Sequence, residues 1–467
     1  MVFSLAWAFY FDEKETINAF LWTIGLTLIP GFLVWKFTPK PEHDLKVREG
    51  FVIVALGWIL CTFFGSLPFY ISGAIPNFTD AFFETMSGLT TTGATILTEI
   101  EGMDNGLLFW RSFLHWLGGM GIILLSLAIL PLLGIGGMQL YKAEVPGPTK
   151  DKVTPRLKDT AKILWQVYLV ITIFQAVCLQ LAGMTFFDAL CHSFGSIATG
   201  GFSTKNASIA AFNSPIIEYL LTAFMFMAGV NFALHYKALS TKKYLLYWFD
   251  KETLFYTLVI AFVTIVASLM IALRGDITSL ANLEESFRHS IFQVVSIMTT
   301  TGYGTDDFEL WPFFPQALLF IMMFIGGCAG STSGGIKGIR ILLLLKHARI
   351  ELRKLVHPNG VFVVRYGKNT IQPEIVTSVL SFFLIFMVTF VGASLVLAAL
   401  GLDLLTAFTA SIACLASIGP GFGTVGPTEN FAHIPMIGKW VLSLCMLMGR
   451  LELYTILILF SRTFWRH

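Results

Sequence analysis

The chain has 467 residues, of which 55% are hydrophobic and only 13% are charged, and its mean hydropathy is +0.73. This composition argues against water as the main solvent of the chain and excludes an ordinary soluble domain. The formal net charge of +2 says little about partners, because in a membrane protein the distribution of charge is informative and the sum is not.

Apolar segments of about 20 residues, long enough to cross a hydrocarbon core of about 30 Å, recur along the whole chain. We predict an all-α polytopic membrane protein with spans at 17–37, 50–72, 107–133, 163–183, 215–236, 253–273, 315–345, 375–400 and 435–461, the seventh being interrupted. Residues 1–11 are too short to span, so 1–49 is predicted to be an N-terminal extra transmembrane region. Four shorter apolar stretches, which end near residues 92, 200, 301 and 418, are predicted to be re-entrant.

Basic residues set the orientation. Residues 36–48, 134–162, 237–252, 337–368 and 462–467 hold 24 of the 31 lysines and arginines. The positive-inside rule assigns that side to the cytoplasm. The four re-entrant stretches then open from the outer side, where acidic residues cluster at Glu99, Glu101, Asp104, Asp306, Asp307 and Glu309.

The ends of the four re-entrant stretches resemble one another. They read "LTTTGAT" (89–95), "IATGGFS" (197–203), "MTTTGYG" (298–304) and "LASIGPG" (415–421), each with a glycine at the fifth position. The unit of span, short helix, turn and span therefore occurs four times. We predict four tandem pore repeats around a pseudo-fourfold axis, with boundaries at 50–134, 135–236, 237–346 and 347–467.

An extended backbone at membrane depth leaves carbonyl groups unpaired, which is tolerable where the segment is buried in protein or lines a wet cavity. Four such loops around one axis would form rings of carbonyl oxygens able to replace the hydration shell of a cation. The alternative is that each turn only caps a buried helix. The agreement of all four loops favours the pore.

The seventh span contains "GGCAGSTSGG" (326–335), with five glycines and three hydroxyl residues. Glycine costs roughly 1 kcal/mol per position in a helix relative to alanine, so we expect this segment to be unwound. A small-residue packing surface, with Gly326 and Gly330 at the required spacing, is the alternative.

Arg450 lies in the last span, about 22 Å below the outer surface if the helix begins near residue 435. A buried arginine in a membrane normally faces a partner or a water-filled path. We favour a position in the pore over an ion pair with Glu452, which faces another side of the helix, and over extension to the inner surface. Among other polar residues, His115 is predicted to make an interhelical hydrogen bond and Tyr303 to brace the third loop by packing.

Two classes of function remain open at this point: a cation pore, and a secondary carrier of another small cation or solute that uses broken helices. No HExxH, GxSxG or membrane-depth carboxylate pair is present, so an enzyme is not predicted. A carrier of the inverted-repeat type would show halves of opposite orientation, whereas these four repeats share one orientation.

The chain resembles the TrkH-type membrane subunits of the Trk/Ktr/HKT superfamily of potassium transporters. The resemblance covers nearly the whole chain and rests on "DAFFETMSGLTTTGAT", "GGMGIILL", "GGMQLYKAEVPGP", "SIATGGFSTKNAS", "IGGCAGSTSGGIKGIRILLLLKH", "LVHPNGV" and "MGRLELYT". It implies K⁺ uptake by a multi-pass protein of the cell (inner) membrane, K⁺ as the transported ion and no organic cofactor in this chain. It also implies a homodimer and a cytoplasmic nucleotide-binding regulatory ring of the TrkA type, and no nucleic-acid partner.

The resemblance also implies site residues. The positions that match the carbonyl-donating filter residues of the family are Thr91, Thr92, Gly93, Thr199, Gly200, Gly201, Thr300, Thr301, Gly302, Ser417, Ile418 and Gly419. In the related plant branch a serine at the first filter glycine accompanies Na⁺ transport, so Gly93 favours K⁺. The gate would comprise Gly326, Gly327, Gly330, Ser331, Thr332, Ser333, Gly334, Gly335 and Arg450. Because the fourth loop departs most from the pattern, we expect an asymmetric filter.

Overall fold

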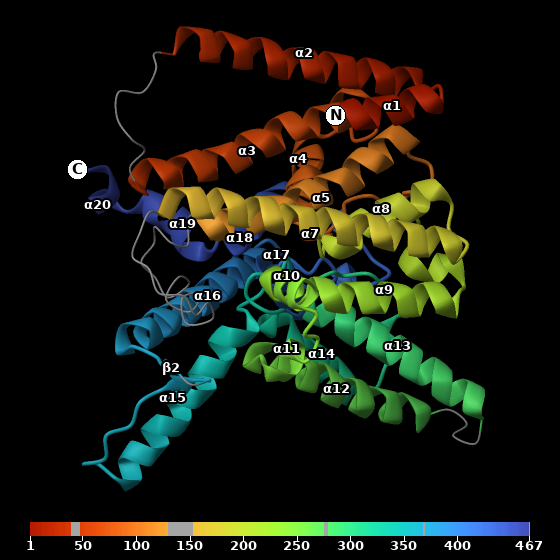
Figure 1. The fold of residues 1–467 in the computed structure, drawn as a ribbon. Helices are drawn as coiled ribbons and strands as arrows, with labels where there is room; N and C mark the ends of the chain where they lie inside the picture. Colours follow the sequence, from red (N-terminus) through yellow and green to blue (C-terminus); the bar gives the residue numbers. More distant parts are fainter. Residues whose placement is uncertain (39–46, 129–152, 275–278, 368, 467) are drawn as a thin grey trace.

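The structure is a computed structural model that describes residues 1–38, 47–128, 153–274, 279–367 and 369–466 (Figure 1). The described chain is almost entirely helical, with one antiparallel pair of two-residue strands, β1 (Arg365–Tyr366) and β2 (Asn369–Thr370). The all-α prediction is confirmed. The predicted boundary between residues 134 and 135 and the motif "GGMQLYKAEVPGP" lie outside the described residues.

The helices follow one another in the predicted order. Two N-terminal helices, α1 (Val2–Tyr10) and α2 (Lys14–Phe37), precede four groups. The first group comprises α3 (Val47–Ile71), α4 (Phe78–Leu89) and α5 (Asn105–Ala128), and the second comprises α7 (Val153–Leu181), α8 (Phe186–Ile197), α9 (Pro215–Ala228), α10 (Phe232–Thr241) and α11 (Leu246–Phe249). The third group comprises α12 (Lys251–Ala272), α13 (Leu280–Met298), α14 (Phe313–Ile325) and α15 (Gly338–Val356). The fourth comprises α16 (Pro373–Ala399), α17 (Leu404–Leu415), α18 (Met436–Arg450), α19 (Leu453–Leu457) and α20 (Arg462–Trp465). Short 3₁₀ turns occur at Ser208–Phe212, Phe308–Leu310, Gly423–Val425 and Ile458–Phe460.

The four groups close into a ring. The second helix of each group, α4, α8, α13 or α17, is called here the pore helix. Each pore helix packs within its own group and against the helix that follows the pore helix of the preceding group: α8 against α5, α13 against α9, α17 against α14, and α4 against α18. The last of these contacts joins the fourth group to the first, so the arrangement is cyclic.

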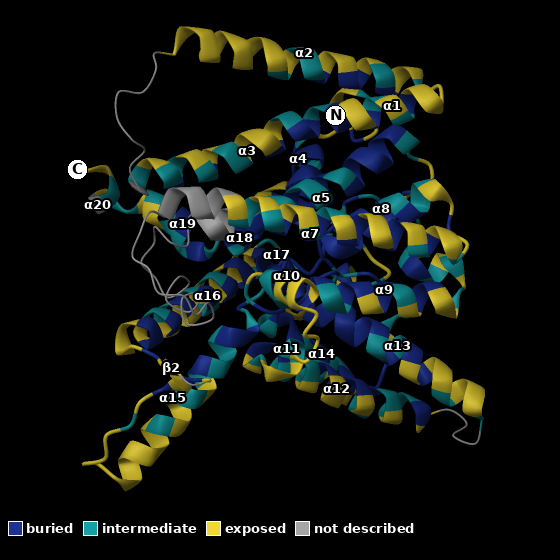
Figure 2. Ribbon diagram, viewed as in Figure 1, coloured by how far each residue is buried: buried dark blue, intermediate teal, exposed yellow. Residues whose placement is uncertain are grey.

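The C-terminal parts of the pore helices are buried, whereas the N-terminal half of α13, which has 19 residues, is largely exposed (Figure 2). Three of them have 12 residues, or about 18 Å at 1.5 Å per residue, which is too short to cross a membrane. Their N-termini are capped by side chains, since Asn77, Thr185 and Asp403 accept hydrogen bonds from backbone N–H groups of the first turn. The caps fix where each helix begins, and each helix then ends at one of the four predicted loops.

Five helices are long and apolar enough to cross a membrane by length and composition: α2, α3, α7, α12 and α16. Two bent pairs, α9 with α10 and α18 with α19, raise this number to seven within the described residues. The two other predicted spans correspond to α5 and to the interrupted pair of α14 and α15. Large apolar side chains are exposed on the outer helices, above all on α2 (Figure 2), as expected of a surface that faces lipid.

The prediction that 215–236 and 435–461 are continuous helices is wrong. The chain bends by 98° between α9 and α10 and by 117° between α18 and α19. At the first bend the Asn231 side chain caps α10, and the Phe232 N–H donates to the Gly330 carbonyl 3.1 Å away. At the second bend Glu452 has a φ of 58°, which ends helical geometry. Apolar residues resume beyond both bends, so the apolar segments resemble single spans in sequence.

Candidate functional site

The four predicted loops share one backbone conformation. They are called here loop 1 (89–95), loop 2 (197–203), loop 3 (298–304) and loop 4 (415–421). The third residue of each loop has a positive φ of 54° to 59°, at Thr91, Thr199, Thr300 and Ser417. The glycine at the fifth position has a φ of 82°, 82°, 83° and 100° in loops 1 to 4. Non-glycine residues rarely adopt positive φ, and strain of this kind concentrates at functional sites.

Backbone hydrogen bonds fold each loop onto its pore helix in the same way. The N–H of the fourth loop residue donates to the carbonyl two residues before the loop begins, at 2.9, 2.7, 2.8 and 2.8 Å in loops 1 to 4. No described residue donates a hydrogen bond to the carbonyl oxygen of the third, fourth or fifth residue of any loop. Twelve buried or partly buried carbonyl groups therefore remain without a partner, although such groups are nearly always paired in proteins. They belong to the twelve residues predicted from the sequence.

The carbonyl groups of adjacent loops lie against the loop glycines. A Cβ atom added to Gly93 would collide with the Gly200 carbonyl oxygen, and one added to Gly201 or Gly302 would collide with the carbonyl oxygen of Thr301 or Ile418. A Cβ on Gly419 would lie 2.8 Å from the Thr92 carbonyl oxygen. The contacts run from loop 1 to 2, 2 to 3, 3 to 4 and 4 back to 1. The four loops thus form one closed ring, and glycine is required because there is no room for a side chain.

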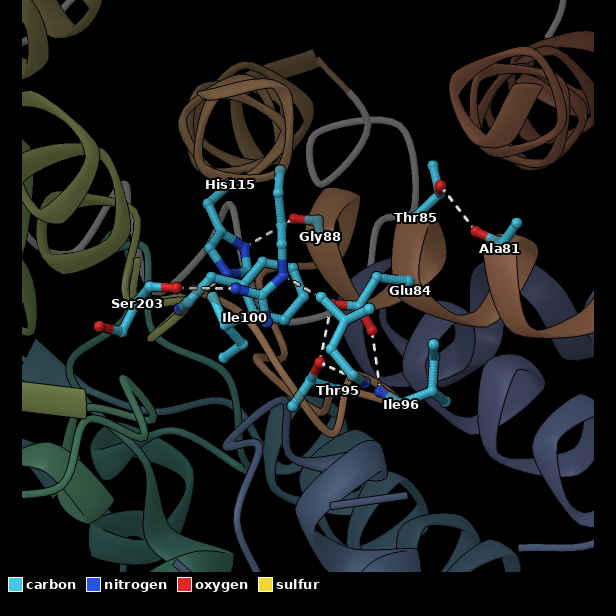
Figure 3. Close-up of polar contacts among 12 residues, drawn as sticks. Ala81, Glu84, Thr85, Gly88, Thr95, Ile96, Ile100, His115 and Ser203 are labelled. Atoms are coloured by element: carbon cyan, nitrogen blue, oxygen red, sulfur yellow. Dashed lines mark hydrogen bonds and ion pairs between the residues drawn. The ribbon is translucent and has the colours of Figure 1, made fainter. Parts of the chain in front are cut away.

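Further hydrogen bonds join neighbouring loops. His115, from α5, donates from Nδ1 to the Gly88 carbonyl at 2.8 Å and accepts at Nε2 from the Phe202 N–H at 3.2 Å, so it connects the first pore helix with loop 2 (Figure 3). Beyond the ring, the Phe431 N–H donates to the Thr95 carbonyl at 2.8 Å. Glu309, beyond loop 3, accepts from the Gly423 N–H beyond loop 4. The interhelical hydrogen bond predicted for His115 is present.

Tyr303 braces loop 3 by hydrogen bonds as well as by packing. Its side chain is buried, and its hydroxyl is within reach of the carbonyl oxygens of His192 and Phe202, at 3.2 and 3.3 Å. Both acceptors belong to the second group, so this phenol connects loop 3 with loop 2. Its own carbonyl accepts from the Ser296 hydroxyl at 2.7 Å.

Substitution of Tyr303 by phenylalanine should lower the free energy of unfolding by about 1 kcal/mol, since it removes one buried hydroxyl donor and leaves its acceptors unpaired. Because the ring of the side chain stays, we expect the Rb⁺ flux through reconstituted protein to fall by no more than about threefold. Thermal unfolding in detergent and radiotracer uptake would measure the two quantities. Wild-type stability in the variant would show that the hydroxyl contributes nothing.

The glycine-rich segment 326–335, called here the intramembrane loop, lies directly against the ring. The Gly334 N–H donates to the Thr300 hydroxyl at 2.7 Å, and the Gly335 N–H donates to the Ala416 carbonyl at 3.0 Å. The Thr332 hydroxyl donates to the Ile197 carbonyl at 2.9 Å. The segment is non-helical, as predicted, and it contacts loops 2, 3 and 4. The structure thereby brings the predicted filter and gate residues together.

Arg450 is buried at the end of α18 and contacts the intramembrane loop. Its two terminal nitrogens donate to the Thr332 carbonyl at 2.7 Å and to the Gly118 carbonyl at 3.1 Å. Its Nε has no partner among the described residues. Glu452 pairs with Arg340 instead. Neither an ion pair with Glu452 nor extension to the inner surface describes this side chain, which is 3% exposed.

Glu252 is a site residue that the sequence analysis missed. It is 2% exposed at the N-terminus of α12. One of its carboxylate oxygens accepts from the Ala329 N–H at 2.8 Å and from the Ile339 N–H at 2.9 Å. A single carboxylate therefore connects the intramembrane loop, at Ala329, with the first turn of α15, at Ile339. Glu84 and Arg111, discussed below, were also missed, although a charged residue within an apolar span is a signal that sequence provides.

The outer side of the ring carries two acidic groups with opposite pKa shifts. Burial works to raise the pKa of Asp306, but His289, whose Nδ1 lies 3.6 Å from the carboxylate, and a hydrogen bond from the Trp311 indole at 2.7 Å outweigh it and hold that pKa below its usual range. Burial raises the pKa of Glu309, despite the hydrogen bond from Gly423. The ionised Asp306 carboxylate is thus stabilised just beyond loop 3, where it adds negative charge to the outer side.

Comparisons with known proteins agree with this geometry. The family model for TrkH, a cation transport protein, matches residues 16–466. The chain is 45% identical to the Trk system potassium uptake protein TrkH of Salmonella typhimurium over 453 residues, which is 96% of this chain and 92% of the relative. It is 38% identical to the Trk system potassium uptake protein TrkG of Escherichia coli over 461 residues, or 98% of this chain and 94% of the relative.

A solved structure is similar along the whole chain. The crystal structure of the potassium transporter TrkH from Vibrio parahaemolyticus superposes with a TM-score of 0.90 at 41% sequence identity, and the match covers 100% of this chain and 97% of the other. Sequence, ring geometry and fold lead to the same conclusion: this chain belongs to the TrkH family of cation transport proteins.

Proposed function

We propose that this protein takes up K⁺ across the cytoplasmic (inner) membrane, and that the ring of loops 1 to 4 is its selectivity filter. The observation that carries the proposal is the closed ring of twelve carbonyl groups that accept no hydrogen bond from any described residue. Carbonyl oxygens arranged in this way can replace the hydration shell of a dehydrated cation. Relatives that are 38% and 45% identical bear the name of potassium uptake proteins.

The pore helices support a cation rather than an anion. All four end immediately at a loop, at Leu89, Ile197, Met298 and Leu415. The C-terminal end of a helix carries a partial negative charge of roughly half an elementary charge. Four such ends directed at one ring favour a positive ion there. The proposed ion-binding residues are the twelve loop residues named in the sequence analysis.

Radiotracer uptake tests the function. Protein reconstituted into K⁺-loaded liposomes should accumulate radioactive Rb⁺, driven by the outward K⁺ gradient. Excess external K⁺ should reduce this Rb⁺ uptake more effectively than excess external Na⁺. Equal competition by both ions would contradict a K⁺-selective filter. Uptake of an organic solute in place of Rb⁺ would favour the carrier.

We further propose that the intramembrane loop and Arg450 form the gate, since the loop touches three of the four filter loops and Arg450 binds its Thr332 carbonyl. A guanidinium group at this depth opposes the passage of cations. Movement of the loop would shift both the obstruction and the charge.

Substitution of Glu252 by alanine should raise basal Rb⁺ flux about threefold or more, because loss of two charge-assisted hydrogen bonds frees the intramembrane loop at Ala329 and the first turn of α15 that follows it. Glu252→Gln keeps an acceptor oxygen and should lie closer to wild type. The preference for Rb⁺ over Na⁺ should not change in either variant, since the Glu252 carboxylate accepts from the Ala329 and Ile339 N–H groups, which lie outside loops 1 to 4. Proteoliposome flux with Na⁺ competition would check both statements, and reduced flux in Glu252→Ala would contradict them.

We also propose that the protein forms a homodimer and binds a cytoplasmic nucleotide-binding ring of the TrkA type. The four pore repeats are proposed to have the boundaries given in the sequence analysis. The proposal rests on the family membership and on the basic residues of the cytoplasmic segments 237–252 and 337–368. Light scattering of the purified protein in detergent would test the dimer. Co-purification with a TrkA-type protein would test the ring.

A further inference from the structure

The residues nine positions before the four filter glycines lie on the four pore helices. They are Glu84, His192, Gln293 and Ala410. The first three each hydrogen-bond to a segment that follows the filter glycine of their own group: His192 to the Ser203 hydroxyl at 2.9 Å and Gln293 to the Asp306 carbonyl at 2.8 Å. Only the first of these residues is an acid, and it has a basic partner.

Glu84 holds the segment that follows loop 1. Its Oε2 accepts from the Ile96 N–H at 2.9 Å, and its Oε1 accepts from the Thr95 hydroxyl at 2.9 Å (Figure 3). The same Oε1 accepts from Arg111 Nε at 2.6 Å. The Glu84 side chain is 0% exposed and that of Arg111 is 2% exposed, so the pair is out of reach of solvent.

Arg111 carries the connection on to loop 2. One of its terminal nitrogens donates to the Ser203 carbonyl at 2.9 Å, and the guanidinium carbon lies 3.6 Å from the centre of the Phe202 ring. Phe202 and Ser203 directly follow the filter glycine Gly201. One ion pair thus fixes the chain just beyond the filter glycines of loops 1 and 2. These two loops are also in direct contact through Gly93 and the Gly200 carbonyl.

We propose that the buried Glu84–Arg111 pair is a positioning pair for selectivity, which sets the spacing of the carbonyl groups in loops 1 and 2 and neutralises the arginine charge beside the filter. This inference rests on the proposed filter function. A buried pair is costly to leave half-formed, because the remaining charge has no water to solvate it. The charge left on Arg111 would repel a cation in the neighbouring ring.

Another arginine supplies the control, although it has two carboxylate partners, since Arg288 also pairs with Glu284 at 3.0 Å. Arg288, on the third pore helix, pairs with Glu218 on α9 at 2.5 Å, and both side chains are nearly buried, at 11% and 6% exposure. Neither residue has a hydrogen bond to loops 1 to 4 among the described residues. Its loss should therefore affect stability without affecting ion selection.

The test measures Rb⁺ uptake into liposomes, alone and with competing Na⁺, for the full chain and three variants. Glu84→Gln should lower Rb⁺ flux about tenfold and reduce the preference for Rb⁺ over Na⁺, since it leaves Arg111 charged. Glu84→Gln with Arg111→Met should recover flux to within about threefold of wild type, while the preference stays low because the Ser203 carbonyl has lost its donor. Glu218→Gln should keep the wild-type preference.

Wild-type ion preference in Glu84→Gln would overturn the proposal, as would equal losses of preference in Glu84→Gln and Glu218→Gln. If Glu84→Gln does not yield folded protein, Thr95→Val replaces it in the test, because it removes one hydrogen bond to Glu84 and no charge. The preference of Thr95→Val for Rb⁺ over Na⁺ should be lower than that of the wild type. An unchanged preference would again overturn the proposal. Absence of Rb⁺ uptake by the wild type would instead refute the proposed function, so the two failures are distinguishable.

Discussion

Replacement of Gly302 by alanine is expected to reduce Rb⁺ flux by about 100-fold or more. Gly302 has a φ of 83°, a conformation that costs an L-residue roughly 1–2 kcal/mol. A Cβ there would also collide with the Ile418 carbonyl oxygen and lie 2.8 Å from Pro420 Cδ. That oxygen is one of the twelve in the ring, so the collision is relieved only by moving a proposed ion ligand.

Gly304→Ala provides the control, two residues further along the same loop. Gly304 has no positive φ, and the nearest atom to an added Cβ would be the Gln293 amide nitrogen at 3.8 Å. Its flux should stay within about twofold of wild type, as for a surface-like substitution without strain. Undiminished uptake by Gly302→Ala, at equal amounts of folded protein, would rule out the filter.

Replacement of Arg450 by alanine is expected to raise Rb⁺ flux about tenfold. The change removes a buried positive charge from below the filter, where a unit charge about 12 Å from the ion is worth about 1.4 kcal/mol at an effective dielectric constant of about 20. It also removes the two hydrogen bonds that tie α18 to the Thr332 and Gly118 carbonyl groups. Both effects open the pathway.

Arg450→Gln separates these two effects, because glutamine can still donate to one carbonyl but carries no charge. High flux in both variants would assign the obstruction to the charge, and high flux in alanine alone would assign it to the hydrogen bonds. Arg450→Lys keeps the charge and should remain close to wild type. Unchanged flux in Arg450→Ala would contradict a place for this residue in the pathway.

The asymmetry expected of the filter is visible in the side chains behind it. In loop 1 the Thr92 hydroxyl bonds to the Thr90 hydroxyl at 2.8 Å, and in loop 3 the Thr301 and Thr299 hydroxyls are also 2.8 Å apart. Loop 4 has Ile418 at the matching position and cannot form this contact. Its backbone nevertheless follows the same path, with a φ of 58° at Ser417 and 100° at Gly419. The four loops therefore share one backbone conformation, although the hydrogen bonds made by their side chains differ.

Sequence alone was sufficient for features that depend on local properties of the chain. The length of an apolar segment decides whether it can cross a membrane, and a glycine in a buried turn reveals a backbone that other residues cannot follow. The break at 326–335, the short length of the four re-entrant stretches and the preference for the pore over an ion pair of Arg450 with Glu452 all follow from such properties. The interpretation of the four loops as one pore came from comparing these local patterns along the chain.

Only the tertiary structure decided which groups meet. Arg450 binds carbonyl groups 118 and 332 residues away in the chain, and Glu84 meets Arg111 across 27 residues and two helices. The bends after α9 and α18 depend on contacts such as that of Phe232 with Gly330, and the closure of the ring depends on Gly419 lying beside Thr92. Local sequence determines how far a segment reaches and how it can turn. The partner of a buried polar group comes from the distant segment that is packed against it. A polar group without a partner in a dry interior costs free energy, and a hydrogen bond from that segment removes the cost.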